Sequence, residues 1–374
     1  MRAMSKKIIG CVLSLLLVLT GCTSHSNVSL DGKIYKDAKF DCADLTLNEE
    51  DLEKAGFEFG DSIDVEFSNG YSMPDVPYYN GYYVKTGEPV IVAYPNDDYV
   101  LIANNNADFW SIAGFENDMS VTLTLDEKGK YIDTYKALGQ SYSTKRKEYS
   151  SDEVFANFRS LKGGNLKENL IYRGASPVDN SRNRASYANK LIESVGVQCE
   201  IDLADSKKDM EGYFSLDTFY SEYAKELYEE GNAITLSMNS DIDSDIYMDG
   251  VKNAIEFMLS HSGPYYIHCM EGKDRTGFVC LMLEALTGAD YNEMRKDYMT
   301  TYLNYYGISK SKTPEKYKAV VSLYFNGFLE DITGIRDDDQ LKQMSYVDSA
   351  KDYLLDCGLS QTEIEQFIHL ITKE

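Results

Sequence analysis

The pattern of hydrophobic and polar positions divides the chain into two parts. Between residues 46 and 140, short apolar runs such as "DSIDVEFS" and "PVIVAY" alternate with turns that contain Gly or Asn-Gly, which predicts strands. From residue 152 onward, apolar runs of strand length alternate with stretches of helical period. This alternation favours a mainly parallel sheet flanked by helices. We therefore expect a small β-rich module at 46–140, a linker at 141–151 and an α/β domain at 152–374.

The first 22 residues follow a different pattern. A basic segment, "MRAMSKK", precedes the apolar run "IIGCVLSLLLVL", which is too short to span a bilayer comfortably. The run leads into "LTGC", which ends at Cys22 and resembles the lipobox of bacterial lipoproteins. The resemblance implies a signal peptide at 1–22 and an exported protein held on the cell membrane of a bacterium by lipid on Cys22. The alternative is an ordinary signal peptide with an incidental cysteine. We expect residues 23–45 to be a spacer.

Composition narrows the functions that are open to this chain. Its 61 acidic and 37 basic residues give a net charge of −24, which argues against a nucleic-acid partner. A site that binds an anion must therefore be locally positive, although the chain as a whole is negative. The cysteines after Cys22 are sparse and odd in number, which is not typical of a disulfide framework; they are Cys42, Cys199, Cys269, Cys280 and Cys357. With four histidines and no zinc-ligand spacing, we expect no metal site and no cofactor.

One segment combines a thiol with a polar loop between two apolar elements: "YYIHCMEGKDRTGFVCLMLEAL", residues 265–286. Cys269 follows a β-prone run, and a helix is expected to begin at Thr276. In α/β sheets, ligands bind at the carboxyl ends of strands, beside helix N-termini. There the loop N–H groups and the helix dipole attract an anion and stabilise a thiolate, so Cys269 is a candidate nucleophile. Arg275 can bind two oxygens of a phosphate with its planar guanidinium.

The loop "HCMEGKDRTG" resembles the signature of cysteine-dependent protein tyrosine phosphatases, His-Cys-x5-Arg-Thr/Ser-Gly. More closely, "HCxxGKDRTGF" is similar to a bacterial tyrosine-phosphatase and lipid-phosphatase family. The segments "NFRSL", "LIYRGASP", "GVQCEIDLAD" and "YLLDCGLSQTEIEQF" resemble other parts of that family, so the likeness covers about 152–374. It implies an α/β phosphatase domain that forms a phosphocysteine intermediate without a cofactor. If Cys269 were only a buried core residue, the three charges of "KDR" would have no explanation.

We expect several residues in and beside the loop that follows Cys269 to bind the phosphate or to stabilise the thiolate. The phosphate cradle would be formed by Met270, Glu271, Gly272, Lys273, Asp274 and Arg275. The family motif implies that His268 holds the loop and helps to keep the thiolate, although it could be a core histidine without chemistry. Thr276 can donate its hydroxyl to the sulfur. Lys273 resembles a feature of phosphatases that act on phosphoinositides; the alternative is a solvated surface lysine.

The reaction also needs a general acid that protonates the leaving oxygen. The family resemblance points to the stretch "ITLSMNSDIDSDIYMDG", where Asp241 occupies the matching position but Ser240 replaces the family's proline. Asp243, Asp245 and Asp274 remain candidates for the same role, and each carboxylate could also be an ordinary solvated loop residue.

The expected function is the hydrolysis of phosphate monoesters. Protein phosphotyrosine is the first expected substrate, and phosphoserine, phosphothreonine and phosphoinositides are further ones. One alternative is a tyrosine-phosphatase-like phosphatase of inositol polyphosphates. Another is a surface binding protein whose phosphatase domain is vestigial, although the intact Cys269, Arg275 and Thr276 argue against it.

Overall fold

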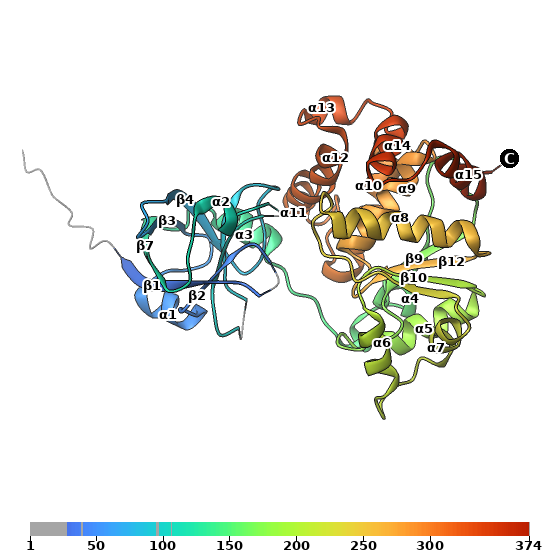
Figure 1. The fold of residues 1–374 in the computed structure, drawn as a ribbon, viewed down its shortest axis with the longest axis horizontal. Helices are drawn as coiled ribbons and strands as arrows, with labels where there is room; N and C mark the ends of the chain where they lie inside the picture. The colour runs from blue at the N-terminus through green and yellow to red at the C-terminus, as the bar shows by residue number, and fades with distance from the viewer. Residues whose placement is uncertain (1–27, 39, 95–96, 106, 374) are drawn as a thin grey trace, which may run out of the picture.

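The computed structural model describes residues 28–38, 40–94, 97–105 and 107–373, which form two parts joined by a connecting segment (Figure 1). The expected signal peptide and the lipidation site at Cys22 lie outside the described residues. Within the described part of the chain, no helix has the length and apolar character needed to cross a membrane.

The N-terminal part is a closed barrel in which the strand order is β1-β2-β6-β5-β4-β3-β7. Its strands are β1 (Ser29–Lys36), β2 (Ala43–Leu45), β3 (Ser62–Phe67), β4 (Ser72–Tyr79), β5 (Pro89–Val92), β6 (Leu101–Asn104) and β7 (Met119–Glu127). β7 closes the barrel because it pairs antiparallel with both β1 and β3. Two short helices, α1 (Glu49–Ala55) and α2 (Trp110–Ala113), accompany the strands. Alternating side chains such as Ile63 and Val65 fill the interior.

The predicted spacer at 23–45 is wrong from Ser29 onward, because β1 and β2 belong to the barrel. The sequence signal was weak there. In β1, "SLDGKIYK", only Ile34 is fully buried, and most of the other side chains face outward. The hydrophobic alternation that usually reveals a strand is therefore almost absent, and the pairing with β7 decides the structure.

The C-terminal part contains a five-stranded sheet of order β11-β10-β12-β9-β8. The strands are β8 (Arg159–Ser160), β9 (Ile171–Ala175), β10 (Cys199–Asp202), β11 (Ala233–Thr235) and β12 (Tyr265–Cys269). β9, β12, β10 and β11 pair in parallel, and β8 is an antiparallel edge strand. The carboxyl ends of β9, β10 and β12 thus meet at one edge of the sheet.

Helices cover both faces of this sheet (Figure 1). One face carries α4 (Asp152–Phe155), α5 (Ala185–Ser194), α6 (Lys207–Phe214) and α7 (Glu222–Glu229). The other carries α8 (Asp245–Ser260), α9 (Asp274–Leu286), α14 (Val347–Asp356) and α15 (Gln361–Ile371). The remaining helical segments are α10 (Tyr291–Tyr306), α11 (Pro314–Val320), a π-helical turn at Val321–Phe325, α12 (Asn326–Thr333) and α13 (Asp338–Leu341). α9 is buried on every side, which explains its continuous apolar sequence.

The two parts are connected by α3 (Ile132–Leu138) and a 3₁₀ turn at Arg146–Glu148. Leu138, at the end of α3, packs into the core of the C-terminal part. The predicted mixed α/β class with a β-rich first part is confirmed, and the closure of that first part into a barrel is an addition that the sequence pattern did not reveal.

Candidate active site

Cys269 is the last residue of β12, and α9 begins at Asp274, so residues 270–273 form a short loop between strand and helix. The Cys269 side chain is 4% exposed. Gly272 has a φ of 65°, and a Cβ at this position would lie 2.1 Å from the carbonyl oxygen of Gly174. Only glycine combines this left-handed backbone with so close an approach. The loop therefore folds tightly against the end of β9.

The carbonyl oxygens of the loop are held by donors from outside it. The Met270 oxygen accepts a hydrogen bond from the backbone N–H of Ser176 at 3.1 Å. The Glu271 oxygen accepts one from the Tyr305 hydroxyl at 2.6 Å. The Gly272 oxygen accepts two, including one from Arg173 Nη2 at 2.9 Å. Because the carbonyls point outward, the opposite side of the loop presents backbone N–H groups, which can bind the oxygens of a phosphate.

A buried ion network supports the loop from behind. Asp297 of α10 accepts hydrogen bonds from Arg173 at 2.6 Å and from Arg159 at 2.6 Å. Asn157 donates to the Gly272 oxygen at 3.1 Å and accepts from Arg159 at 2.8 Å. We predicted no role for these residues, although three of them lie in the segments "NFRSL" and "LIYRGASP" that resembled the phosphatase family.

The surroundings of Cys269 favour its thiolate. Burial raises the pKa of this thiol, but the positive charge of Arg275 and hydrogen bonding from the Thr276 hydroxyl and N–H outweigh burial, so the pKa is lowered from its usual value. The Thr276 hydroxyl is buried and has no partner other than Cys269 among the described residues. It is thus available to the sulfur when charge develops there.

Arg275 lies in the first turn of α9 and reaches across the loop. Its Nη1 donates to the carbonyl oxygen of Met238 at 2.9 Å, and its own carbonyl accepts from the Tyr247 hydroxyl at 3.2 Å. No other hydrogen bond of its guanidinium to a described residue is seen. Nε and Nη2 therefore remain for a ligand, as a bidentate phosphate contact requires.

His268 lies beside Cys269 in β12, but its side chain belongs to a buried acidic cluster on the other face of the sheet. Nε2 lies 2.8 Å from Glu200 Oε1, and Nδ1 lies 3.9 Å from Asp202 Oδ1. Burial lowers the pKa of His268, but the charge of Asp202 and the hydrogen bond to Glu200 prevail and raise it to about 9. Burial, with the charge of Asp202, likewise raises the pKa of Asp205 to about 7. His268 of β12 is thus a protonated imidazolium that contacts Glu200 and Asp202 of β10.

The sequence reasoning missed these three acidic residues. Glu200 and Asp202 lie within β10, in the apolar run "VQCEIDLA", and both side chains are at most 1% exposed. Acidic side chains inside a buried strand are rare unless they have a partner. That signal, read together with His268, could have revealed the cluster.

The predicted acid candidates lie on two segments beside the arginine. Asp241 and Asp243 follow β11 in the loop that Arg275 contacts through Met238, and Asp243 N–H donates to Asp241 Oδ1 at 3.2 Å. Burial, together with the charge of Asp241, raises the pKa of Asp243. Asp245 is exposed in the first turn of α8. Asp274 is 57% exposed and pairs with Lys273 at 3.3 Å. Asp241 and Asp243 thus lie in a loop that Arg275 contacts, and Asp274 is the neighbour of Arg275 in the first turn of α9.

The side chain of Glu271 contacts residues outside the loop. The Glu271 side chain accepts a hydrogen bond from the Tyr142 hydroxyl and lies 3.4 Å from Arg182. Its contribution to the cradle is therefore through its backbone. Met270 is 36% exposed. Lys273, by contrast, is only 20% exposed and lines a cavity, so it is not a solvated surface lysine.

A group of possible metal ligands exists in the barrel, remote in sequence from this loop. Asp37, Cys42 and Asp44 place one ligand atom each within 4.8 Å of one another. Burial, with the neighbouring carboxylates, raises the pKa of Cys42 to about 12 and that of Asp44 to about 6.

Comparison with known proteins gives a family for the C-terminal part. Residues 153–373 match the model of the tyrosine phosphatase family. No curated protein sequence matches the chain significantly. Among solved structures, the core catalytic domain of the PP-IP phosphatase SIW14 from S. cerevisiae, in complex with citrate, is 17% identical with a TM-score of 0.26; the alignment covers 52% of this chain and 98% of that one.

A second solved structure, of an uncharacterized conserved protein from Thermotoga maritima, is 18% identical with a TM-score of 0.22. That alignment covers 26% of this chain and 36% of the other, so the chain spans about a third of that relative. Both structural likenesses are weak, and the assignment rests on the family model. The family model matches more than half of the chain, including the whole loop from Cys269 to Arg275. The chain belongs to the tyrosine phosphatase family.

Proposed function

We propose that this protein is an exported, lipid-anchored phosphatase that hydrolyses phosphate monoesters through a phosphocysteine intermediate, with protein phosphotyrosine as its first substrate. The observation that carries the proposal is the position of Cys269. Its thiol, whose pKa the charge of Arg275 helps to lower, lies at the end of a buried strand, beside a loop whose carbonyls at residues 270–272 accept hydrogen bonds from outside the loop. A thiolate in a phosphate cradle is suited to attack phosphorus.

In the first step, Cys269 Sγ attacks the phosphorus atom, and the bond from phosphorus to the leaving oxygen breaks. Arg275 and the loop N–H groups bind the three equatorial oxygens, where charge is concentrated. Asp241 gives its proton to the leaving oxygen, so the alcohol or phenol departs neutral.

In the second step, a water molecule attacks the phosphocysteine. The carboxylate that lost its proton takes one from the water, the sulfur–phosphorus bond breaks, and inorganic phosphate forms. The Thr276 hydroxyl, which has no partner other than Cys269 among the described residues, stabilises the departing thiolate. No metal or cofactor enters either step.

A second candidate function is the hydrolysis of inositol polyphosphates or phosphoinositides. The partly buried position of Lys273 favours it, because this side chain lines a cavity and its ammonium group can bind a further anionic group.

Phosphate release from a substrate panel tests the proposal. The panel consists of phosphotyrosine, phosphoserine and phosphothreonine peptides, phosphoinositides and inositol hexakisphosphate. Cys269→Ser should abolish turnover but keep phosphate-ester binding, because the cradle and Arg275 remain. Cys199→Ala is the control, since this thiol lies in the same sheet and burial raises its pKa to about 11.

Substantial turnover by Cys269→Ser would exclude the phosphocysteine route. If the wild-type protein binds the esters but releases no phosphate from any of them, the vestigial binding protein is the correct alternative. Preference for inositol hexakisphosphate over every peptide would select the second candidate.

A further inference from the structure

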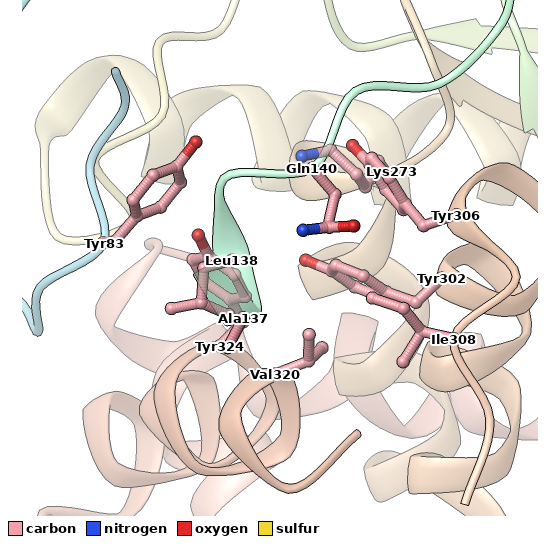
Figure 2. Close-up of a pocket in the computed structure, with 10 residues that line it drawn as sticks. All are labelled: Tyr83, Ala137, Leu138, Gln140, Lys273, Tyr302, Tyr306, Ile308, Val320 and Tyr324. Carbon is pink, nitrogen blue, oxygen red and sulfur yellow. The ribbon is translucent and has the colours of Figure 1, made fainter. Parts of the chain in front are cut away.

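The segment that connects the barrel to the phosphatase domain, residues 139–151, runs along the loop that follows Cys269. Gln140 of this segment and Lys273 of the loop line the same cavity of about 80 Å³ (Figure 2). Two residues further on, the Tyr142 hydroxyl donates a hydrogen bond to Glu271 Oε1. The family model begins at residue 153, so these contacts come from a part of the chain outside the family match.

Tyr142 is fixed by an aromatic stack and a buried arginine. Its ring centroid lies 5.0 Å from that of Tyr305, with an angle of 23° between the two rings. The Arg184 guanidinium lies 4.8 Å from the first centroid and 4.6 Å from the second. Arg184 is 1% exposed and donates to the carbonyl oxygens of Ser143 at 3.3 Å and Phe155 at 2.8 Å. The Tyr142 hydroxyl therefore has a defined position beside the loop.

Glu271 is held at its backbone and at its side chain. Its carbonyl oxygen accepts a hydrogen bond from the Tyr305 hydroxyl at 2.6 Å. Its carboxylate accepts one from Tyr142 and lies 3.4 Å from Arg182 Nε. A carbonyl and the N–H of the next residue share one planar trans peptide and point in opposite directions. Because the Glu271 carbonyl is bound from outside the loop, the N–H of Gly272 is directed toward the phosphate cradle.

A carboxylate is an unfavourable group in a loop that binds phosphate. Like charges repel, and the low dielectric constant of a buried site strengthens the repulsion. Burial raises the pKa of Glu271, although the charge of Lys273 opposes this change. A hydrogen-bond donor and a guanidinium beside the carboxylate favour its charged form. The contacts with Tyr142 and Arg182 keep that charge on the outer side of the loop.

From these contacts we infer that Tyr142 is a positioning residue of the active site: together with Arg182, it holds the Glu271 carboxylate outside the phosphate cradle and so preserves the affinity of the loop for phosphate. The inference rests on the proposed function, in which the phosphate group of the substrate occupies the loop of Cys269. It deepens that function by giving the connecting segment a part in the binding of phosphate esters.

Steady-state kinetics with phenyl phosphate test the inference in the full-length protein. Tyr142→Phe keeps the ring that stacks on Tyr305 but removes the donor to Glu271. The released carboxylate repels the ester equally in the ground state and in the transition state, so KM should rise about tenfold while kcat changes less than about threefold. Tyr131→Phe is the matched control, because it removes a hydrogen bond of the same kind, to Asp75 at 2.6 Å, within the barrel.

A second substitution separates control of the charge from simple structural support. Adding Glu271→Gln to Tyr142→Phe should return KM to within about twofold of the wild type, because a neutral amide does not repel phosphate. If Tyr142 only stabilised the fold, this rescue would not occur, and its absence would overturn the inference. Glu271→Gln alone should bind phosphate at least as tightly as the wild type, and weaker binding would also contradict the inference.

Calorimetry with inorganic phosphate on Cys269→Ser measures the same effect without turnover. In this protein Tyr142→Phe should weaken phosphate binding about tenfold, and Glu271→Gln should restore it. If this result holds while the wild type hydrolyses no ester, the inference stands and the proposed function fails. If the wild type hydrolyses esters but Tyr142→Phe changes neither KM nor phosphate affinity, the function stands and the inference is wrong. Absence of both phosphate binding and turnover overturns both.

Discussion

At the scale of single residues, the open question is which carboxyl group serves as the acid. Asp241→Asn should slow hydrolysis of a phosphotyrosine peptide by roughly 10²–10⁴-fold, because the leaving phenolate then departs without a proton. An aryl phosphate with an activated leaving group needs little protonation and should be affected much less. Steady-state rates on the two substrates measure this difference.

The same comparison applies to the neighbouring aspartates. Asn substitutions of Asp243, Asp245 and Asp274 should show little dependence on the leaving group. If Asp274→Asn alone shows it, the acid lies within the signature loop and the assignment of Asp241 is wrong. In the Asp241→Asn variant the acidic limb of the pH–rate profile should persist, since it reports the Cys269 thiolate, while the basic limb should flatten.

At the scale of elements, the strand–loop–helix unit of β12 and α9 depends on the ion network behind it. Asp297→Asn removes the negative charge that faces Arg173 and Arg159, both largely buried. The free energy of unfolding should fall by about 3–5 kcal/mol, the usual effect of breaking a buried pair. kcat should fall as well, because Arg173 also holds the Gly272 carbonyl.

Urea unfolding followed by circular dichroism measures this loss of stability. Glu256→Gln is the matched control, because its partner Lys252 lies 3.9 Å away and both side chains have considerable solvent access. That variant should change stability by less than about 0.5 kcal/mol. Equal effects of the two substitutions would show that the network does not support the loop.

The contact between His268 of β12 and Glu200 of β10 should make the free energy of unfolding depend on pH. The pKa of His268 is about 9 in the folded protein and about 6.5 as an ordinary histidine. A folded pKa above the unfolded one stabilises the protein fully below pH 6.5, and this contribution is lost as the pH rises through 9. The raised pKa values of Asp205 and Glu200 act in the same direction at lower pH.

Hydrogen exchange of the β12 amides at pH 6.5 and pH 9, corrected for the intrinsic exchange rates, reports this effect without interference from the barrel. Protection should decrease toward pH 9 in the wild type and decrease less in Glu200→Gln, where the histidine has lost its hydrogen-bonded carboxylate. Protection that rises with pH would contradict the assigned imidazolium.

At the scale of the whole molecule, the open question is where the protein acts, and the segment before the barrel bears on this question. We propose that lipid on Cys22 anchors it. Cys22→Ala should move the protein from the membrane fraction to the soluble fraction or leave the precursor uncleaved, because two acyl chains give stable attachment. Cys11→Ala, in the same apolar run, should leave fractionation unchanged. If Cys22→Ala fractionates as the wild type and the wild type carries no lipid, the anchor is excluded.

The sequence could predict the strand, loop and helix around Cys269 and offer a hypothesis for their chemistry, because these residues are local in sequence. Cys269, Gly272, Arg275 and Thr276 lie within one short segment, and their order sets strand end, turn, helix start and phosphate-binding groups. The same locality predicted the alternation of strands and helices beyond residue 152. The sequence could not decide which residue is the general acid. Several aspartates lie close together in the same loops, and their distances to a substrate depend on packing.

The tertiary structure decided everything that joins distant parts of the chain. It closed the barrel by pairing β1 with β7, and it placed Glu200 against His268. It also brought Tyr83 and Lys273, almost two hundred residues apart in the sequence, to the lining of one cavity. Local pattern encodes period and turn chemistry, whereas contacts between distant residues arise only when the whole core packs. The sequence alone therefore determined which residue is the candidate nucleophile and which loop holds it, while packing decided which distant residues surround that loop.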